Sequence, residues 1–261
     1  MLKVRVIPTL LVREVNLVKG PAFDSWRSVG SPMQSVKVFN RRDVDELVIL
    51  DINATPAGVE PDYDQVATLA QESFVPLTVG GGVVSVDCIR KLLQAGADKV
   101  LINTRAYTDP TLITAAANRF GTQCVVIGID YRRHADGTLE CFSHCGTVPT
   151  GRSPLDWARE VKRLGAGEIQ LTSIERDGLM QGYDLQTIRE VTQAVAIPVI
   201  ASGGAGSYEH MRQAVQEGGA SAVSAASMFL FTEQTPAEAK RYLAEAGLPV
   251  RAVHREGAAR S

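Results

Sequence analysis

The stretch VPLTVGGGVVSVDCIRKLLQAGA at residues 75–97 reads as one unit: a short apolar strand, a run of glycines and an amphipathic helix. Moved forward by 122 positions, it falls on IPVIASGGAGSYEHMRQAVQEGG at 197–219, which has the same order of parts. The same shift carries VDELVILDI (44–52) onto AGEIQLTSI (166–174), and a shift of 119 places the first strand on CVVIGIDYR (124–132). Repetition over several strand–helix units indicates a fold built from two similar halves.

Short runs rich in valine, isoleucine and leucine alternate with amphipathic helical patterns along the chain. Three expected helices, 109–121, 153–165 and 235–247, share a proline at the start and a glycine at the end, which are favoured at those positions. Ser153 is an expected N-cap, because its hydroxyl can accept a hydrogen bond from a backbone N–H of the first turn. The expected strands cover 5–10, 46–50, 75–79, 98–102, 124–129, 168–172, 197–201 and 221–225.

This alternation predicts the fold class. Eight strands that alternate with eight helices over about 250 residues are typical of an α/β protein with a parallel (β/α)8 barrel. We expect one barrel over residues 1–250, built from half-barrels at about 1–120 and 121–250, and a flexible tail at 251–261. A doubly wound sheet is less favoured, since no GxGxxG motif follows the first strand.

Composition and charge exclude several classes of protein. A chain of 261 residues with 45% hydrophobic content can bury a large core, and a net charge of −2 offers no basic surface for nucleic acid. Because every apolar run is short, we expect no membrane span and no signal peptide. Four cysteines at irregular spacing indicate reduced thiols and a cytoplasmic protein. Cys141, His144 and Cys145 lack a second pair of ligands, so we expect a surface hairpin there and no metal.

Glycines follow two of the expected strands at repeat-related places, and each set is accompanied by small or polar residues after the next strand. The sets are Gly81, Gly82, Asn103 and Thr104, and Ser202, Gly203, Gly204, Ala226 and Ser227. Glycines at a strand end let backbone N–H groups approach an anion, although a single copy is equally well explained as a tight turn. Two copies on opposite sides of one barrel mouth favour phosphate binding. They predict an elongated substrate with a phosphate at each end.

Several motifs resemble the cyclase subunit family of imidazole glycerol phosphate synthase, a lyase of histidine biosynthesis. They are LDI (50–52), LTVGGG (77–82), DKVLINT (98–104), LTSIERDG (171–178) and VIASGGAG (199–206), and the likeness runs from residue 2 to about 250. The isomerase family of the same pathway shares the repeat and the phosphate sites. The resemblance implies a heterodimer in which a glutaminase subunit supplies ammonia. The ammonia converts a bisphosphorylated ribulosyl-formimino substrate to imidazole glycerol phosphate and an aminoimidazole carboxamide ribotide, and no metal or organic cofactor is implied.

Charged residues at the amino ends of four expected strands distinguish cyclase from isomerase. Arg5, Glu46, Lys99 and Glu168 match, position by position, the charged gate through which the cyclase family admits ammonia, and an isomerase has no need of it. Two cations and two anions can compensate one another if the ring is partly buried. Asp98, beside Lys99, matches a family position at the glutaminase interface.

One departure from the family concerns the chemistry. The cyclase family has an aspartate at the end of strand one and another at the end of strand five, and the two act as general acid and base. This chain has Asp130 on strand five but Leu11 on strand one, where it reads TLLV with Thr9 in place of cysteine. Leucine cannot transfer a proton, and one acid–base partner contributes about 10²–10⁴-fold in rate. Glu14, three residues further along in a loop, is not an obvious replacement.

Other family positions are kept. Lys19 lies in an expected lid loop at 12–31, and the resemblance gives Lys19 and Asp177 catalytic roles beside Asp130. Asp51, Thr172 and Ser202 match substrate-binding positions.

Three hypotheses follow. TLLV, EPDY (60–63) and ERDGLMQGYD (175–184) resemble diverged paralogues that, with a glutaminase-like partner, convert an activated acetamido sugar to an acetamidino sugar in surface-polysaccharide synthesis. The segment TPAEAKRYLAEAGLPVR (235–251) instead resembles the histidine-pathway cyclase. The third hypothesis is a scaffold without catalysis that binds a phosphorylated ligand and a glutaminase. The retained Asp130, Asp177 and Lys19 favour an enzyme, and Leu11 favours a scaffold or a changed chemistry. Between the two enzymes, the missing acid favours the paralogue.

Overall fold

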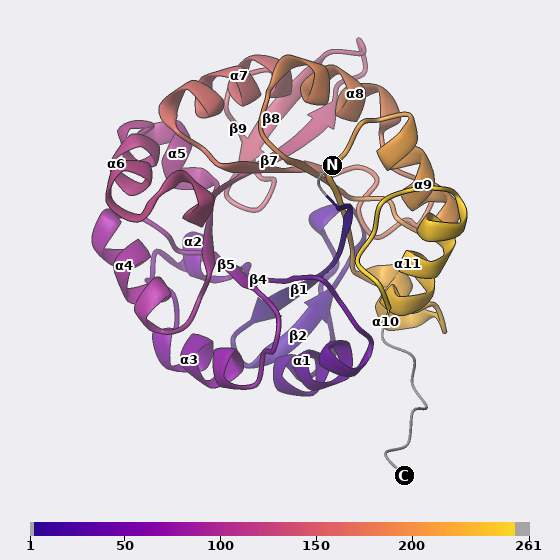
Figure 1. Ribbon diagram of the computed structural model, residues 1–261. Helices are drawn as coiled ribbons and strands as arrows, with labels where there is room; N and C mark the ends of the chain where they lie inside the picture. Colours follow the sequence, from indigo (N-terminus) through magenta and orange to yellow (C-terminus); the bar gives the residue numbers. More distant parts are fainter. Residues whose placement is uncertain (1–2, 254–261) are drawn as a thin grey trace.

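The computed structural model describes residues 3–253. Within them, eight parallel strands form a closed barrel in the order β1-β4-β5-β6-β7-β10-β11-β12, and β12 pairs with β1 to close it (Figure 1). The predicted (β/α)8 barrel is therefore confirmed. The barrel strands are β1 (Arg5–Arg13), β4 (Leu47–Asp51), β5 (Leu77–Gly80), β6 (Lys99–Ile102), β7 (Val125–Arg133), β10 (Glu168–Ser173), β11 (Val199–Ser202) and β12 (Ala222–Ala225).

An outer layer of helices surrounds the barrel (Figure 1). In the described range it consists of α1 (Pro32–Arg41), α3 (Tyr63–Gln71), α4 (Val86–Gln94), α6 (Thr111–Phe120), α7 (Pro154–Leu164), α8 (Leu185–Ala194), α9 (Tyr208–Gln216) and α11 (Pro236–Glu245). The expected cap of α7 is present, since the Ser153 side chain accepts a hydrogen bond from the N–H of Asp156. Thr235 and Glu238 form a capping box at the start of α11.

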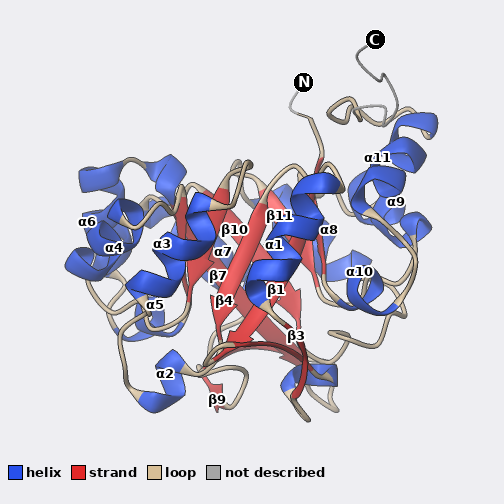
Figure 2. Cartoon of the chain, turned by 90° about the horizontal axis from the view of Figure 1, so that it is seen from below, coloured by secondary structure: helices blue, strands red, loops and turns tan. Residues whose placement is uncertain are grey.

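Shorter elements, of which the sequence analysis predicted only the hairpin at 139–149, gather at the carboxyl ends of the strands (Figure 2). The short helices are α2 (Ala54–Ala57), α5 (Thr104–Thr108) and α10 (Ser227–Phe231), with a 3-10 turn at Pro21–Phe23; a second 3-10 turn, Thr122–Cys124, lies at the amino end of β7. The additional strands are β2 (Asn16–Lys19), β3 (Arg27–Gly30), β8 (Leu139–Ser143) and β9 (Val148–Pro149), which are antiparallel to their neighbours.

Three expectations from the sequence need revision. The segment 12–31 is not a simple loop, because it contains the end of β1 and the paired strands β2 and β3. The 139–149 segment is the expected hairpin, but Cys141 is fully buried rather than on the surface. The expected tail at 251–261 lies mostly outside the described residues, and 251–253 have no helix or strand.

Prolines explain why two strands begin later than predicted. Strands β5 and β11 begin at Leu77 and Val199, each directly after a proline that has no N–H for the sheet. The carbonyl groups of these prolines are used: Pro76 accepts from Leu47 at 2.9 Å, and its repeat partner Pro198 accepts from Ile169 at 3.0 Å. The repeat seen in the sequence is thus repeated in backbone hydrogen bonds.

The barrel interior is stacked in layers, because alternate residues of each strand face inward. The first layer, at the amino ends of the strands, contains the charged side chains of Arg5, Glu46, Lys99 and Glu168. Above it Ile7, Val48, Ile200 and Ala222 form a small apolar cluster, separate from the main core between barrel and helices. The next layers line a cavity that opens at the carboxyl ends of the strands. None of the helices in the described range is long and apolar enough to cross a bilayer.

A buried ion pair attaches the last helix to the barrel. Lys240 of α11 is fully buried, and its Nζ lies 3.2 Å from Asp45 and 3.4 Å from Asp43. Asp45 also accepts the backbone N–H of Val6 at 2.9 Å. Burial raises the pKa of Asp45, and the Val6 hydrogen bond and the charge of Lys240 oppose that change.

We expect Lys240→Met to lower the free energy of unfolding by about 3–5 kcal/mol, because it leaves the carboxylate of Asp45 buried without its cation. Urea unfolding at neutral pH measures the difference. The double variant Lys240→Met/Asp45→Asn should recover most of the loss, since it removes the uncompensated charge. A single variant as stable as the unaltered protein would contradict this account.

Candidate active site

One cavity of about 390 Å³ occupies the barrel mouth at the carboxyl ends of the strands, where active sites of such barrels lie. All residues predicted as catalytic or substrate-binding line it. They are Leu11, Lys19, Asp51, Gly81, Gly82, Asn103, Thr104, Asp130, Thr172, Asp177, Ser202, Gly203, Gly204, Ala226 and Ser227. Residues from both repeats therefore converge on a single cavity.

The two glycine turns have the same backbone geometry. Gly81 and Gly203 have φ of 102° and 83°, which side chains rarely adopt. A Cβ at Gly81 would lie 2.1 Å from the carbonyl oxygen of Asp51, and one at Gly203 would lie 2.5 Å from that of Ser173, the repeat partner of Asp51. Only glycine allows these close approaches. Since β5 and β11 are four strands apart in the closed sheet, the turns lie on opposite sides of the mouth.

Some polar groups near the turns already have hydrogen-bond partners within the protein, and one has none. The N–H of Gly82 donates to Thr55 Oγ1 at 3.1 Å, and Thr104 Oγ1 accepts the N–H of His144 at 3.0 Å. Ser227, at the start of α10, is buried, and its Oγ has no hydrogen-bond partner. A buried hydroxyl without a partner costs folding free energy, which is consistent with a ligand-binding role.

Asp130 lies in the cavity wall at the centre of a polar cluster. Asn103 Nδ2 donates to Asp130 Oδ2 at 2.8 Å, while Asn103 Oδ1 is buried without a partner. The pKa of Asp130 is raised to about 7, mainly because burial disfavours the charged carboxylate. A hydrogen bond with Thr172 acts in the opposite direction, and the charge of Asp177 raises the pKa further. A carboxyl group with this pKa can both take and give a proton near neutral pH.

Lys19 and Asp177 form an ion pair at the cavity. Lys19 is the last residue of β2 and is only 2% exposed, so it is held in place by a strand rather than carried on a loop. The backbone supports the same contact, since Ala22 N–H donates to the carbonyl oxygen of Asp177 at 2.8 Å. The β2–β3 hairpin is thereby fixed against the segment after β10.

The remaining predicted residues have less direct roles. Asp51 faces the cavity, but its Oδ1 accepts the N–H groups of Asn53 and Ala54 at 2.8 and 3.1 Å and so fixes the start of α2. Leu11 lines the cavity as an apolar residue and is 8% exposed. Glu14 is exposed and is not among the residues that line the cavity, so it does not replace the missing acid.

The hairpin after β7 contributes residues that the sequence analysis treated only as candidate metal ligands. His144 and Cys145 line the cavity, and Cys145 donates from Sγ to the carbonyl oxygen of Ile52. Burial, with the charges of Asp130 and Asp51, raises the pKa of Cys145 to about 12, so it is a neutral thiol at physiological pH. Among residues 3–253 no group of three or more His, Cys, Asp or Glu side chains could hold a metal ion.

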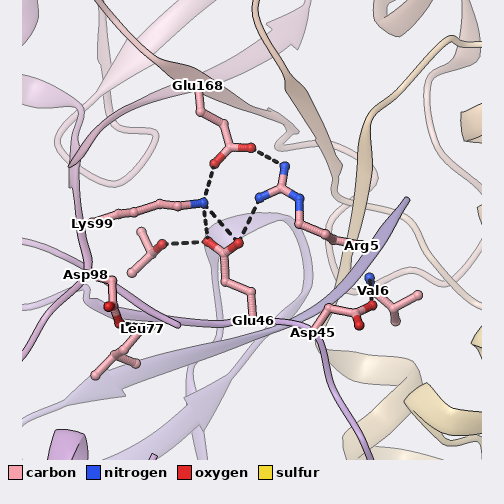
Figure 3. A network of polar contacts seen from close by, with 9 residues as sticks. Arg5, Val6, Asp45, Glu46, Leu77, Asp98, Lys99 and Glu168 are labelled. Atoms are coloured by element: carbon pink, nitrogen blue, oxygen red, sulfur yellow. Dashed lines mark hydrogen bonds and ion pairs between the residues drawn. The ribbon is translucent and has the colours of Figure 1, made fainter. Parts of the chain in front are cut away.

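At the opposite end of the barrel, the four predicted gate residues form a closed ring (Figure 3). Arg5 contacts Glu46 at 2.8 Å and also pairs with Glu168, and Lys99 lies 2.9 Å from each glutamate. Thr78 Oγ1 adds a hydrogen bond to Glu46 at 2.9 Å. The ring is assembled from three strands, β1, β6 and β10, and from Glu46, the residue before β4, so its geometry depends on barrel closure.

Mutual compensation keeps the ring charged. Burial disfavours the charge on Arg5, but the hydrogen bond and charge of Glu168 outweigh it and raise the pKa of Arg5. Burial also disfavours a charged Glu168, yet the hydrogen bond with Arg5 and the charges of Arg5 and Lys99 lower its pKa overall.

Asp98 has a structural role that can be read directly. Its Oδ2 accepts the N–H of Leu77 at 2.8 Å, and its own N–H donates to the carbonyl oxygen of Leu77 (Figure 3). Asp98 is also exposed at the amino-end face beside the ring. A partner contact at this residue stays a prediction.

An acid-bearing cavity at the carboxyl ends of a (β/α)8 barrel is the arrangement of barrel enzymes. Residues 5–235 match the model of the histidine biosynthesis protein family. Since the match covers nearly the whole chain, the protein belongs to this family, whose members are histidine-biosynthesis-type barrel enzymes. This membership is consistent with the cyclase-subunit resemblance of its motifs.

The raised pKa of Asp130 makes stability depend on pH. Because the folded protein binds this proton more tightly than the unfolded chain, wild type loses stability relative to Asp130→Asn as the pH rises from about 4 to 7. We expect the variant to be more stable by up to about 4 kcal/mol above pH 7 and equally stable below pH 4. Urea unfolding across this pH range measures the difference.

The same substitution should abolish turnover while leaving affinity for inorganic phosphate nearly unchanged. Loss of both to the same extent would contradict an acid–base role for Asp130.

Proposed function

We propose that this protein is an ammonia-using synthase subunit that acts on a phosphorylated, sugar-type acceptor at the barrel mouth and receives ammonia from a glutaminase partner docked at the charged ring. The observation that carries the proposal is the closed ring of Arg5, Glu46, Lys99 and Glu168 on the barrel axis, opposite the acid-bearing cavity. A ring of charges that must be desolvated is costly to maintain for structure alone.

The barrel interior supports passage of a small neutral molecule. Between ring and cavity lie Ile7, Val48, Ile200 and Ala222, each at most 1% exposed. Because these four side chains are apolar, an ammonium ion would lose hydration beside them, whereas neutral ammonia has a much smaller desolvation penalty. Passage requires the ring side chains to move apart, because their ion pairs close the floor. The ring therefore serves as a gate and the apolar layer as a filter for the uncharged species.

The cavity supports a phosphorylated acceptor. The glycine turns at Gly81 and Gly203 are repeat-related, and Ser227, whose Oγ has no partner, lines the same cavity. Backbone N–H groups at such turns bind anions. Their opposite placement across the mouth positions the centre of a long acceptor over Asp130.

Asp130 supplies the proton chemistry in this proposal. As ammonia attacks a trigonal carbon of the acceptor, its nitrogen gives up a proton, which Asp130 accepts and can return to the leaving group. The facing position is Leu11, so a second carboxyl group is absent there. This favours an acceptor other than the ribulosyl-formimino substrate, such as an activated acetamido sugar, over the histidine-pathway cyclase reaction.

Turnover of the ribulosyl-formimino substrate with ammonium chloride at alkaline pH tests the proposal. We expect the unaltered protein to be inactive and Leu11→Asp to gain activity by at least about 10²-fold over that background, because the variant restores the second acid. Full activity of the unaltered protein would establish the histidine-pathway reaction and contradict the proposal that the site takes a different acceptor. Absence of turnover in both proteins would contradict retained catalytic residues of the cyclase and favour the scaffold hypothesis.

The gate role makes a separate prediction. In the complex with its glutaminase, Lys99→Met should lower glutamine-driven turnover at least about tenfold more than turnover with ammonium salt, because an opened or disordered floor leaks or blocks delivered ammonia without changing the mouth. The matched control is Lys91→Met, an exposed lysine of α4 that pairs with Glu60 and Asp87. Equal loss with both nitrogen sources would contradict the gate.

A further inference from the structure

The two halves of the barrel present unlike side chains to the interior. At five inward-facing positions the first half has an apolar residue or glycine, and its repeat partner in the second half is polar. The pairs are Leu11 and Asp130, Val48 and Gln170, Leu50 and Thr172, Gly80 and Ser202, and Leu101 and Ser224. In the cavity the first half therefore contributes the apolar residues Leu11, Leu50 and Leu101 beside the polar Thr9 and Asn103. The second half contributes the polar residues Asp130, Gln170, Thr172, Ser202 and Ser224.

Gln170 is the member of the polar wall that lacks a partner. It lies on β10 between Glu168 of the ring and Thr172, lines the cavity and is 3% exposed. Its Oε1 is buried and has no hydrogen-bond partner. Burying an amide without a partner costs folding free energy, so a packing role alone does not explain glutamine here.

The neighbours of Gln170 are already engaged with one another. Thr9 Oγ1 and Ser224 Oγ are hydrogen-bonded at 2.5 Å, and Thr172 bonds to Asp130. The side-chain amide of Gln170 thus has an acceptor oxygen open to a ligand, as Asn103 does beside Asp130. It carries an acceptor oxygen and a donor NH₂ side by side, which is complementary to a group that presents N–H and C=O together, namely another amide.

The opposite side of the cavity can hold the alkyl group that is attached to an amide. Leu11, Leu50 and Leu101 line the cavity from the first half and provide an apolar surface for a short alkyl group. We infer that Gln170 is the specificity-determining residue for an acceptor with an N-acyl group, whose amide lies on Gln170 and whose alkyl end lies on the leucine wall. The inference relies on the proposed function for a phosphorylated acceptor in this cavity and names its chemical class.

Calorimetric binding of N-acetylglucosamine 1-phosphate and glucose 1-phosphate tests the inference without ammonia, glutaminase or turnover. We expect the unaltered protein to bind the N-acetyl compound at least about tenfold more tightly, as expected for a buried amide that is otherwise unpaired. In Gln170→Leu the preference should fall to within about twofold, with the affinity for glucose 1-phosphate unchanged. The matched control Gln186→Leu, on the exposed face of α8, should keep the full preference.

The melting temperature distinguishes a residue that binds the ligand from one that stabilises the fold. Gln170→Leu should raise the melting temperature by about 2–4 °C, because it removes a buried unpaired amide while keeping the side-chain volume. A lowered melting temperature would show that Gln170 holds the barrel together, and it would overturn the inference.

Other outcomes are equally decisive. No preference in the unaltered protein, no binding of either sugar phosphate, or a preference that survives Gln170→Leu would overturn the inference. So would a variant that keeps the preference and only raises the KM for ammonia, since Gln170 would then serve ammonia rather than the acceptor. Absence of ammonia-dependent turnover, with the binding preference intact, would overturn the proposed function alone.

Discussion

Closure of the sheet is the constraint on which the other features depend. In a closed barrel of parallel strands every second side chain must enter the interior, and residues at the same height meet in one layer. Arg5, Ile7, Thr9 and Leu11 are successive inward residues of β1, and they belong to the ring, the apolar layer and the cavity in turn. A shift of one residue in the register of this strand would exchange each of them for a residue of the outer core.

The internal repeat gives this layered interior its two-fold character, and substitutions have since made the halves different. Backbone features are shared almost position by position, as the Gly81 and Gly203 turns and the Pro76 and Pro198 carbonyl contacts show. Inward side chains differ instead, with Leu11 facing Asp130 as the clearest case. Backbone geometry resists change because a glycine turn tolerates no Cβ, whereas a cavity-facing side chain can change without disturbing the fold.

Much of the fold followed from the sequence because the relevant signals are local. Strand-length apolar runs, the Ser153 cap and the proline and glycine at helix ends act within a few residues, and they placed most barrel strands within one or two residues. The ring was also anticipated, since charges at strand starts need only the strand positions. The β2–β3 hairpin was missed because its polar segment has no strand alternation, and its strands are defined by pairing with β1.

The unpartnered state of Gln170 was beyond sequence reasoning for a different reason. Its inward direction follows from its spacing from Glu168, but whether a buried amide finds a partner depends on distant strands. Likewise the burial of Cys141 and the position of Lys19 arise from how hairpins fold over the mouth. The local sequence pattern predicts whether a side chain points inward and in which layer it lies. Whether a buried polar group finds a hydrogen-bond partner depends on the assembled interior.

The matched glycine turns have a consequence for how a ligand enters. Under the proposed function, two equivalent phosphate-binding turns would accept a molecule charged at both ends in two opposite orientations, and half of the encounters would be unproductive. The unlike walls beneath the turns remove this degeneracy, because only one orientation places apolar groups on the leucines and polar groups on Asp130 and Gln170. The difference between the side chains of the two halves thus fixes the orientation of a ligand, although the glycine turns at the rim are still symmetric.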